Sequence, residues 1–153
     1  MTLEDAVRRL RRFLLAILVL GMSGTAAELL LLSHHEDAKQ SIPLVLIGAA
    51  LLVLAWHGAA GAAASVRALQ VTMLLFVGAG ALGMVLHFRS TMEFQLETDP
   101  SLKGRKLYWK ALQAKAPPTL APGVMVQLGL LGLAYAYRHP ALRAADHGSN
   151  SGG

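Results

Sequence analysis

The chain contains no cysteine, and this absence removes several kinds of structure and chemistry. Disulfide bonds, thiolate metal sites, iron–sulfur clusters and cysteine nucleophiles all require that residue. Charge is also scarce, because only 15% of the residues are Asp, Glu, Lys or Arg, against about 25% in an average soluble domain. No Walker A, HExxH or nucleophile-elbow sequence occurs. The composition therefore argues against a soluble enzyme.

Long apolar runs take the place of the missing charge. A bilayer's hydrocarbon core is about 30 Å thick, so a crossing helix needs about 20 apolar residues. Four runs of about this length lie at 13–33, 42–65, 68–88 and 120–137. We predict an all-α integral membrane protein in which residues 1–143 form one domain, an antiparallel bundle of four transmembrane helices. Four spans and their connections leave no room for a soluble catalytic domain.

The first run has to be distinguished from a cleaved signal peptide, because it follows a basic segment and contains a patch of small residues. Apolar residues resume after the patch, from Leu29 to Leu32. The whole run is therefore too long for an ordinary signal peptide. We predict that it is retained as a helix.

The basic residues bear on orientation. Four arginines precede the first run, at positions 8, 9, 11 and 12, and favour a cytoplasmic N-terminus. An even number of crossings returns the C-terminus to the same side, although the two sides of this arrangement carry seven Lys or Arg each. The pattern is similar to that of small bacterial membrane proteins with four helices. We therefore expect the bacterial inner membrane, with both termini cytoplasmic.

The third connection is long and contains a helical signal of its own. Asp99-Pro100 suits a helix start and Pro117-Pro118 a stop, which predicts a short helix over about 100–115. Its cationic and apolar side chains fall on different faces, as in a helix that lies in the head-group region. The alternative is a solvated hairpin packed on the bundle. The expected membrane-interface residues are Lys103, Lys106, Lys110, Tyr108 and Trp109. The small, polar tail 144–153 is expected to be disordered.

Small residues spaced four apart indicate where helix backbones can approach closely. The packing positions predicted in this way are Gly21, Thr25, Ala79 and Gly83. The segment 78–83 also matches the GxGxxG pattern of dinucleotide-binding proteins. That pattern has meaning only between a strand and a helix. Because 78–83 lies within an apolar run, we assign its glycines to helix packing.

Glu28 is the only carboxylate inside a predicted span. By helix rise, it lies about 7 Å from the middle of its run. An acid at this depth is costly unless it is protonated or partnered, so it is a candidate functional residue. The structural alternative is a carboxyl that reaches the head groups or holds helices in register.

Further polar residues are expected near the membrane surface at the outer end of that helix. Histidine and carboxylate side chains suit zinc and other divalent metals, and one histidine from each of two helices could hold a haem. Adjacent histidines point about 100° apart on a helix, however, and do not bind from one face. We predict no cofactor, and keep a metal or a haem as alternatives. The candidate ligands are His34, His35, Glu36, Asp37 and His87.

His57 is expected at the opposite membrane surface, where the second run ends. It follows Trp56, and the fourth run ends with Tyr135 and Tyr137 at the same surface. Aromatic residues gather at membrane–water boundaries. We therefore assign His57 to an aromatic belt rather than to a ligand site.

The missing catalytic motifs and the small-residue helix faces together favour a non-enzymatic accessory or assembly subunit of a larger membrane complex. Its expected partners are membrane lipids and other membrane subunits or a second copy. Nucleic acid is not expected, because the basic residues flank the spans. The alternative is a small transporter, or a metal- or ligand-binding membrane protein, that uses Glu28 and His87 around a filled cavity. An enzyme would need those same groups to bind a metal.

Overall fold

The computed structural model describes residues 2–31, 38–114 and 120–143, and this part of the chain is helical. Three of its helices, the first three in chain order, are long and apolar enough to cross a membrane. The last helix has 17 residues, which gives a length of about 25 Å. The helices are α1 (Leu3–Leu31), α2 (Ala38–Ala60), α3 (Ala63–Thr98), α4 (Gly104–Leu112) and α5 (Leu120–Ala136).

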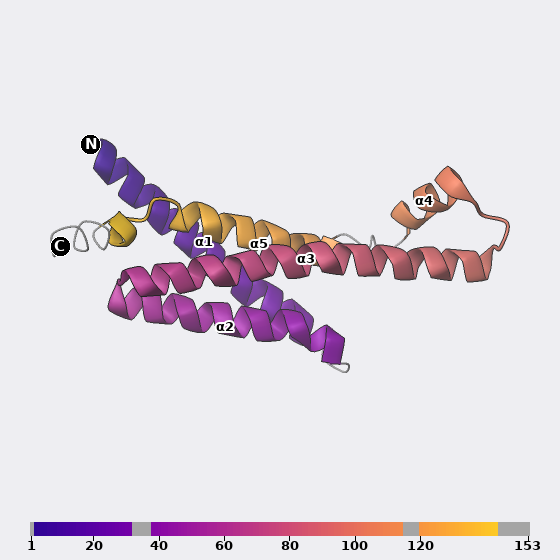
Figure 1. Ribbon diagram of the computed structural model, residues 1–153, viewed down its shortest axis with the longest axis horizontal. Helices are drawn as coiled ribbons and strands as arrows, with labels where there is room; N and C mark the ends of the chain where they lie inside the picture. The colour runs from indigo at the N-terminus through magenta and orange to yellow at the C-terminus, as the bar shows by residue number, and fades with distance from the viewer. Residues whose placement is uncertain (1, 32–37, 115–119, 144–153) are drawn as a thin grey trace, which may run out of the picture.

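α3 lies between α2 and α5 and packs on both (Figure 1). α2 and α5 both run antiparallel to α3 and lie along it, while α1 crosses the group at an angle and packs on α5 and α2. The beginning of α1, the α2–α3 turn and the end of α5 are at one end of the bundle. We call this the Gly61 end, after the glycine in the turn.

The core follows a stripe along α3. Leu69, Met73 and Phe76 are completely buried, at the spacing of four and three residues that places side chains on one helix face. Glycines let α5 approach this stripe closely. A Cβ atom at Gly80 would lie only 2.7 Å from the backbone oxygen of Pro122. The two helices are therefore in backbone contact, as small residues permit in membrane bundles.

The turn between α2 and α3 is very short. Gly61 has a φ of +59°, a left-handed conformation that costs glycine little. Its N–H donates to the carbonyl oxygen of His57 at 2.9 Å and closes the last turn of α2. Because only residues 61–62 separate the two helices, Ser65 returns to a position beside His57.

α1 begins earlier than the sequence predicts, at Leu3 rather than near residue 13. Thr2 and Asp5 stabilise this start. The Thr2 hydroxyl oxygen accepts from the N–H of Asp5 at 3.2 Å, and the Asp5 carboxylate accepts from the Thr2 N–H at 3.3 Å. This is the reciprocal arrangement of a capping box, with Asp in place of Glu. The N-terminal arginines therefore lie on the helix itself.

α3 continues to Thr98, although the sequence predicts an end near residue 88. The segment 89–98 contains neither glycine nor proline and can remain helical outside an apolar environment. The helix ends at Asp99, whose backbone is extended because a proline follows it. The prediction that Asp99-Pro100 begins the loop helix is therefore wrong. The pair ends α3, and α4 begins at Gly104.

Candidate functional site

Polar side chains from four helices meet at the Gly61 end. His57, Ser65 and Tyr135 are buried there, with exposed fractions of 7%, 0% and 5%. A buried polar group costs free energy unless it is hydrogen-bonded, so each of these groups needs a partner. We call the whole group the polar end cluster. Its members are Arg11 of α1, His57 of α2, Ser65 of α3, Tyr135 of α5 and His139 just after α5.

His57 occupies the centre of the polar end cluster. Its Nδ1 lies 2.9 Å from Ser65 Oγ and its Nε2 lies 2.8 Å from the Tyr135 hydroxyl. The Ser65 hydroxyl donates its one proton to the carbonyl oxygen of Ala62 at 2.7 Å. Nδ1 must therefore be the donor to Ser65, and Nε2 must accept from Tyr135. One neutral tautomer satisfies all three side chains.

This proton arrangement bears on catalysis. In a serine nucleophile, the hydroxyl proton points to the imidazole that removes it. Here the Ser65 proton points to a backbone carbonyl, and the histidine donates to the serine. The arrangement instead connects α2, α3 and α5 by buried hydrogen bonds.

Arg11 connects α1 to the end of α5. Its guanidinium group donates to three backbone carbonyl oxygens, at 2.8 Å to Tyr135 and at 3.1 Å to both Tyr137 and Arg138. The last carbonyls of a helix lack intrahelical partners and carry partial negative charge, so a cation is favourable there. Arg138 also has a left-handed φ of +47°, which is strained for a residue with a side chain. Arg11 holds the strained turn in place.

His139 completes the polar end cluster. Its ring packs edge to face on His57, with centroids 5.1 Å apart, and its Nδ1 accepts from the N–H of Ala141 at 3.3 Å. Burial lowers the pKa of His139, and the neighbouring His57 and Arg11 lower it further. The neutral ring is therefore the form that fits the folded protein.

Acid should destabilise the protein through His139. Because its pKa in the folded state lies below the usual histidine value of 6.5, the unfolded chain binds the proton first as the pH falls. The free energy of unfolding should therefore decrease as the pH falls through 6.5. His139→Asn keeps an acceptor for the Ala141 N–H and should flatten this dependence. Thermal unfolding in detergent between pH 8 and pH 5 measures it. An equally steep dependence in His139→Asn would contradict this prediction.

Glu28 and His87 are both exposed on the described chain, on α1 and α3 respectively. Among the described residues, no hydrogen bond or ion pair joins them. No cluster of three or more His, Asp or Glu side chains that could hold a metal occurs there either. The other candidate ligands, His34, His35, Glu36 and Asp37, lie outside the described residues.

No protein-family model, curated protein or solved structure matches this chain. Its candidate functional residues are therefore identified from their own geometry.

The small residues predicted at helix contacts face α5 in two cases. A Cβ atom at Gly21 would lie 2.6 Å from Leu128 Cδ2, and one at Gly83 would lie 3.1 Å from Pro122 Cβ. Thr25 and Ala79 are half-buried. The closest contacts with α5, however, also involve Gly80, Gly129 and Gly132, which the four-residue spacing did not single out.

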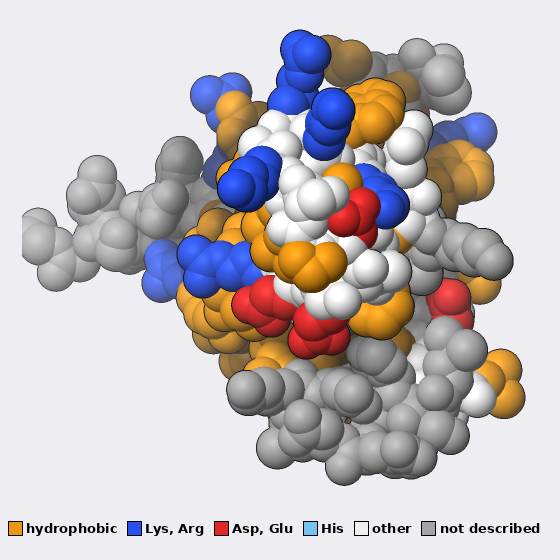
Figure 2. All heavy atoms as spheres, turned by 90° about the vertical axis from the view of Figure 1, so that its right-hand side faces the viewer, with side chains coloured by type: hydrophobic (Ala, Val, Ile, Leu, Met, Phe, Trp, Pro, Cys, Tyr) orange, Lys and Arg blue, Asp and Glu red, His pale blue; other side chains and the backbone are white. Residues whose placement is uncertain are grey.

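α4 packs on the projecting end of α3. The Tyr108 ring stacks on Phe88 with centroids 5.9 Å apart, and Lys110 lies 3.9 Å from the Asp99 carboxylate. Ala111 is buried, while Trp109 is 62% exposed. Figure 2 shows both signs of charge, with hydrophobic side chains between them, at this end of the molecule. Lys103 and Lys106 are exposed, and Leu112 is 47% exposed.

The polar end cluster could not be found from sequence motifs. The sequence predicts His57 and Tyr135 in an aromatic belt at one membrane surface, whereas they are buried and hydrogen-bonded to each other. Tyr137 is exposed. One signal was available in the sequence. Gly61 lies in a short connection between two helices, which predicts a tight turn. A tight turn there places Ser65 beside His57.

Proposed function

We propose that the protein is a non-enzymatic accessory or assembly subunit of a larger membrane complex, and that it binds its partner through the outward face of α1. One observation carries this proposal. Glu28 lies on a helix long and apolar enough to cross a membrane, is exposed, and has no hydrogen-bond or ion-pair partner among the described residues.

The physical reason to expect a partner at Glu28 is the free-energy cost of an exposed acid inside the membrane. A carboxylate at the bilayer centre costs about 2.5–3.5 kcal/mol on insertion scales, and less toward the surface. A hydrogen-bond donor or a cation on a neighbouring protein helix offsets that cost. Gly24, one turn before Glu28 on the same face of α1, is also exposed, and small residues let a second helix approach closely. The partner we propose is therefore a membrane helix with a donor or basic side chain at the depth of Glu28.

As part of this proposal, the chain crosses a bacterial inner membrane four times, and α5 is the fourth crossing. α5 runs beside α3 over its length (Figure 1), which supports a shared membrane depth. α1 begins and α5 ends at the same end of the bundle, and the arginines on the first turns of α1 favour a cytoplasmic location for it. We propose that α4 lies at the opposite surface, with the exposed Trp109 and Leu112 toward the head groups.

The alternative function, transport or ligand binding by Glu28 and His87, requires a cavity at those groups. Two open hollows on the described surface lie along α1, between Asp5 and Ser23. Neither is lined by Glu28 or His87. No observation in the described residues favours this function over assembly.

The proposal predicts how changes at Glu28 affect assembly. Glu28→Gln keeps size and hydrogen-bonding capacity and should preserve the complex, whereas Glu28→Lys reverses the charge and should reduce the recovered partner at least about tenfold. The measurement is affinity purification from the native membrane in mild detergent, with the mass and stoichiometry of the complex. Glu93→Lys is the matched control, because Glu93 is exposed on α3 beyond its apolar part.

Four outcomes are informative. Loss of the partner with Glu28→Lys alone supports the proposal. A monomer in every form contradicts it, as does equal recovery with all three variants. Intact assembly with loss of proton flux or bound metal in Glu28→Gln and His87→Ala would favour the transport or metal alternative.

A further inference from the structure

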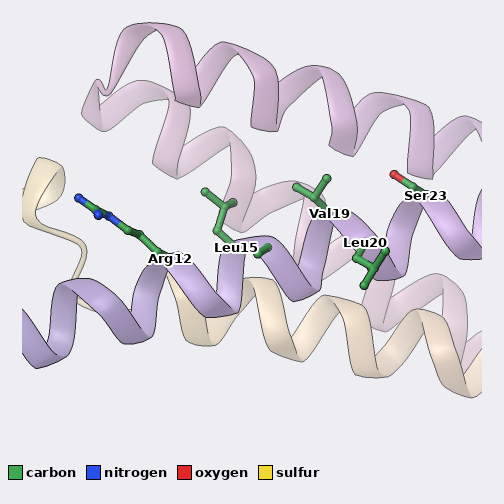
Figure 3. A pocket seen from close by; sticks show the side chains of 6 residues that line it. Arg12, Leu15, Val19, Leu20 and Ser23 are labelled. Carbon is green, nitrogen blue, oxygen red and sulfur yellow. The ribbon is translucent and has the colours of Figure 1, made fainter.

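Two neighbouring hollows follow the outer face of α1 and share one residue. The first is lined by charged side chains, Asp5, Arg8, Arg9 and Arg12. The second continues from Arg12 and is apolar (Figure 3). Its other lining residues are Leu15, Ala16, Val19, Leu20 and Ser23. A basic surface therefore passes directly into an apolar one along a single helix.

The spacing explains why the two hollows are continuous. Positions 5, 12, 16, 19 and 23 are three, four or seven residues apart, so they lie on one stripe of the helix. Figure 3 shows Arg12 at one end of the apolar hollow and Ser23 at the other. The short side chain of Ala16 lies between the larger Leu15, Val19 and Leu20, and this difference in size makes the depression.

The basic hollow has an excess of positive charge. The Arg8 guanidinium lies 3.6 Å from the Asp5 carboxylate, which is the one acidic group in this hollow. Neither Arg9 nor Arg12 forms an ion pair with another of the described side chains, and both are exposed. Arg11 is directed away from this face, to the carbonyls at the end of α5. Three arginines and a single carboxylate therefore line this hollow, and guanidinium matches the geometry of phosphate oxygens.

The apolar hollow has the length of an acyl chain. Arg12 and Ser23 are separated by about 16 Å along the helix, and one leaflet contributes about 15 Å of hydrocarbon. If the arginines lie at the head groups, the stripe from Leu15 to Ser23 covers most of one leaflet. Charge and length thus point to a ligand with an anionic head and an apolar chain.

We propose that this face of α1 is a binding site for one anionic phospholipid. Arg8, Arg9 and Arg12 bind its phosphate, and one acyl chain lies in the apolar hollow over Ala16. The site is separate from the face proposed for the partner protein, because Glu28 is about 160° around the helix from Arg12. The lipid site therefore does not depend on the accessory-subunit function.

The test compares lipids on the purified full chain in detergent. Native mass spectrometry should detect retained dioleoyl phosphatidylglycerol at concentrations where dioleoyl phosphatidylcholine is not retained. Arg9→Gln combined with Arg12→Gln should weaken phosphatidylglycerol binding about 30-fold. The matched control is Arg105→Gln combined with Lys106→Gln on α4, which removes the same charge elsewhere and should change binding less than about twofold.

A second pair of measurements separates a lipid from a free anion. Ala16→Phe fills the apolar hollow without changing charge and should weaken phosphatidylglycerol binding severalfold. Glycerol 3-phosphate, which has the anionic group without the chains, should not displace the lipid at millimolar concentration. Displacement by it, together with full binding by Ala16→Phe, would show a phosphate site and overturn the proposal. Equal losses in the α1 and α4 double variants would also overturn it, because they indicate unspecific attraction. Helical circular dichroism confirms that each variant is folded.

Discussion

Replacing Gly80 with valine should push α3 away from α5 and lower the free energy of unfolding by about 3 kcal/mol. The new Cβ would lie 2.7 Å from the backbone oxygen of Pro122 and 3.0 Å from the backbone nitrogen of Val126. Backbone atoms cannot rotate out of the way as a side-chain tip can. The helices must therefore separate, and the fully buried stripe around Phe76 loses contacts.

Gly78 provides the control on the same helix. No atom lies within 4 Å of a Cβ built there, so Gly78→Val should change the free energy of unfolding by less than about 0.5 kcal/mol. Unfolding in mixed detergent micelles with increasing dodecyl sulfate compares the two variants. Equal stability of the Gly78 and Gly80 variants would show that α3 and α5 do not meet as described.

The second large effect is expected at Arg11. Arg11→Met keeps much of the apolar stem but removes the donors to the carbonyls of Tyr135, Tyr137 and Arg138. Hydrogen bonds from a charged group contribute about 1.5–3 kcal/mol each when they are buried, and less where water reaches them. We therefore expect a loss of about 2–4 kcal/mol in total.

Arg11→Met should reduce stability locally, at the end of α5, as well as in the whole protein. Amide hydrogen exchange at the end of α5 should accelerate in Arg11→Met, because the strained turn at Arg138 loses the group that holds it. Arg12→Met is the matched control, since the Arg12 side chain is exposed. If exchange at the end of α5 is the same in both variants, Arg11 does not hold that end.

The sequence predicts the helices well but not their ends. Apolar runs indicate where a chain can cross a bilayer, because the length requirement is strict. They do not indicate where a helix stops, since backbone hydrogen bonds continue into water if no residue breaks them. α1 therefore begins at the Thr2–Asp5 capping interaction, and α3 continues to Asp99.

The polar end cluster was not predictable for a different reason. Its members come from separate helices, and each one alone resembles an ordinary residue at a helix end. Their contacts depend on which helices are neighbours and on how each is rotated, and small residues only suggest these properties. Gly80 illustrates the difficulty, because a Cβ there would lie 2.7 Å from the backbone oxygen of Pro122, whereas one at Gly78, in the same apolar run, would meet no atom within 4 Å.

The length of α3 has a mechanical consequence. Its 36 residues extend about 54 Å, well beyond the thickness of about 30 Å that a hydrocarbon core requires. The helix contains no proline, the commonest cause of a sharp kink. We expect α3 to transmit a tilt at the Gly61 end along its whole length. Such a tilt would displace Phe88, and with it the stacked Tyr108 of α4.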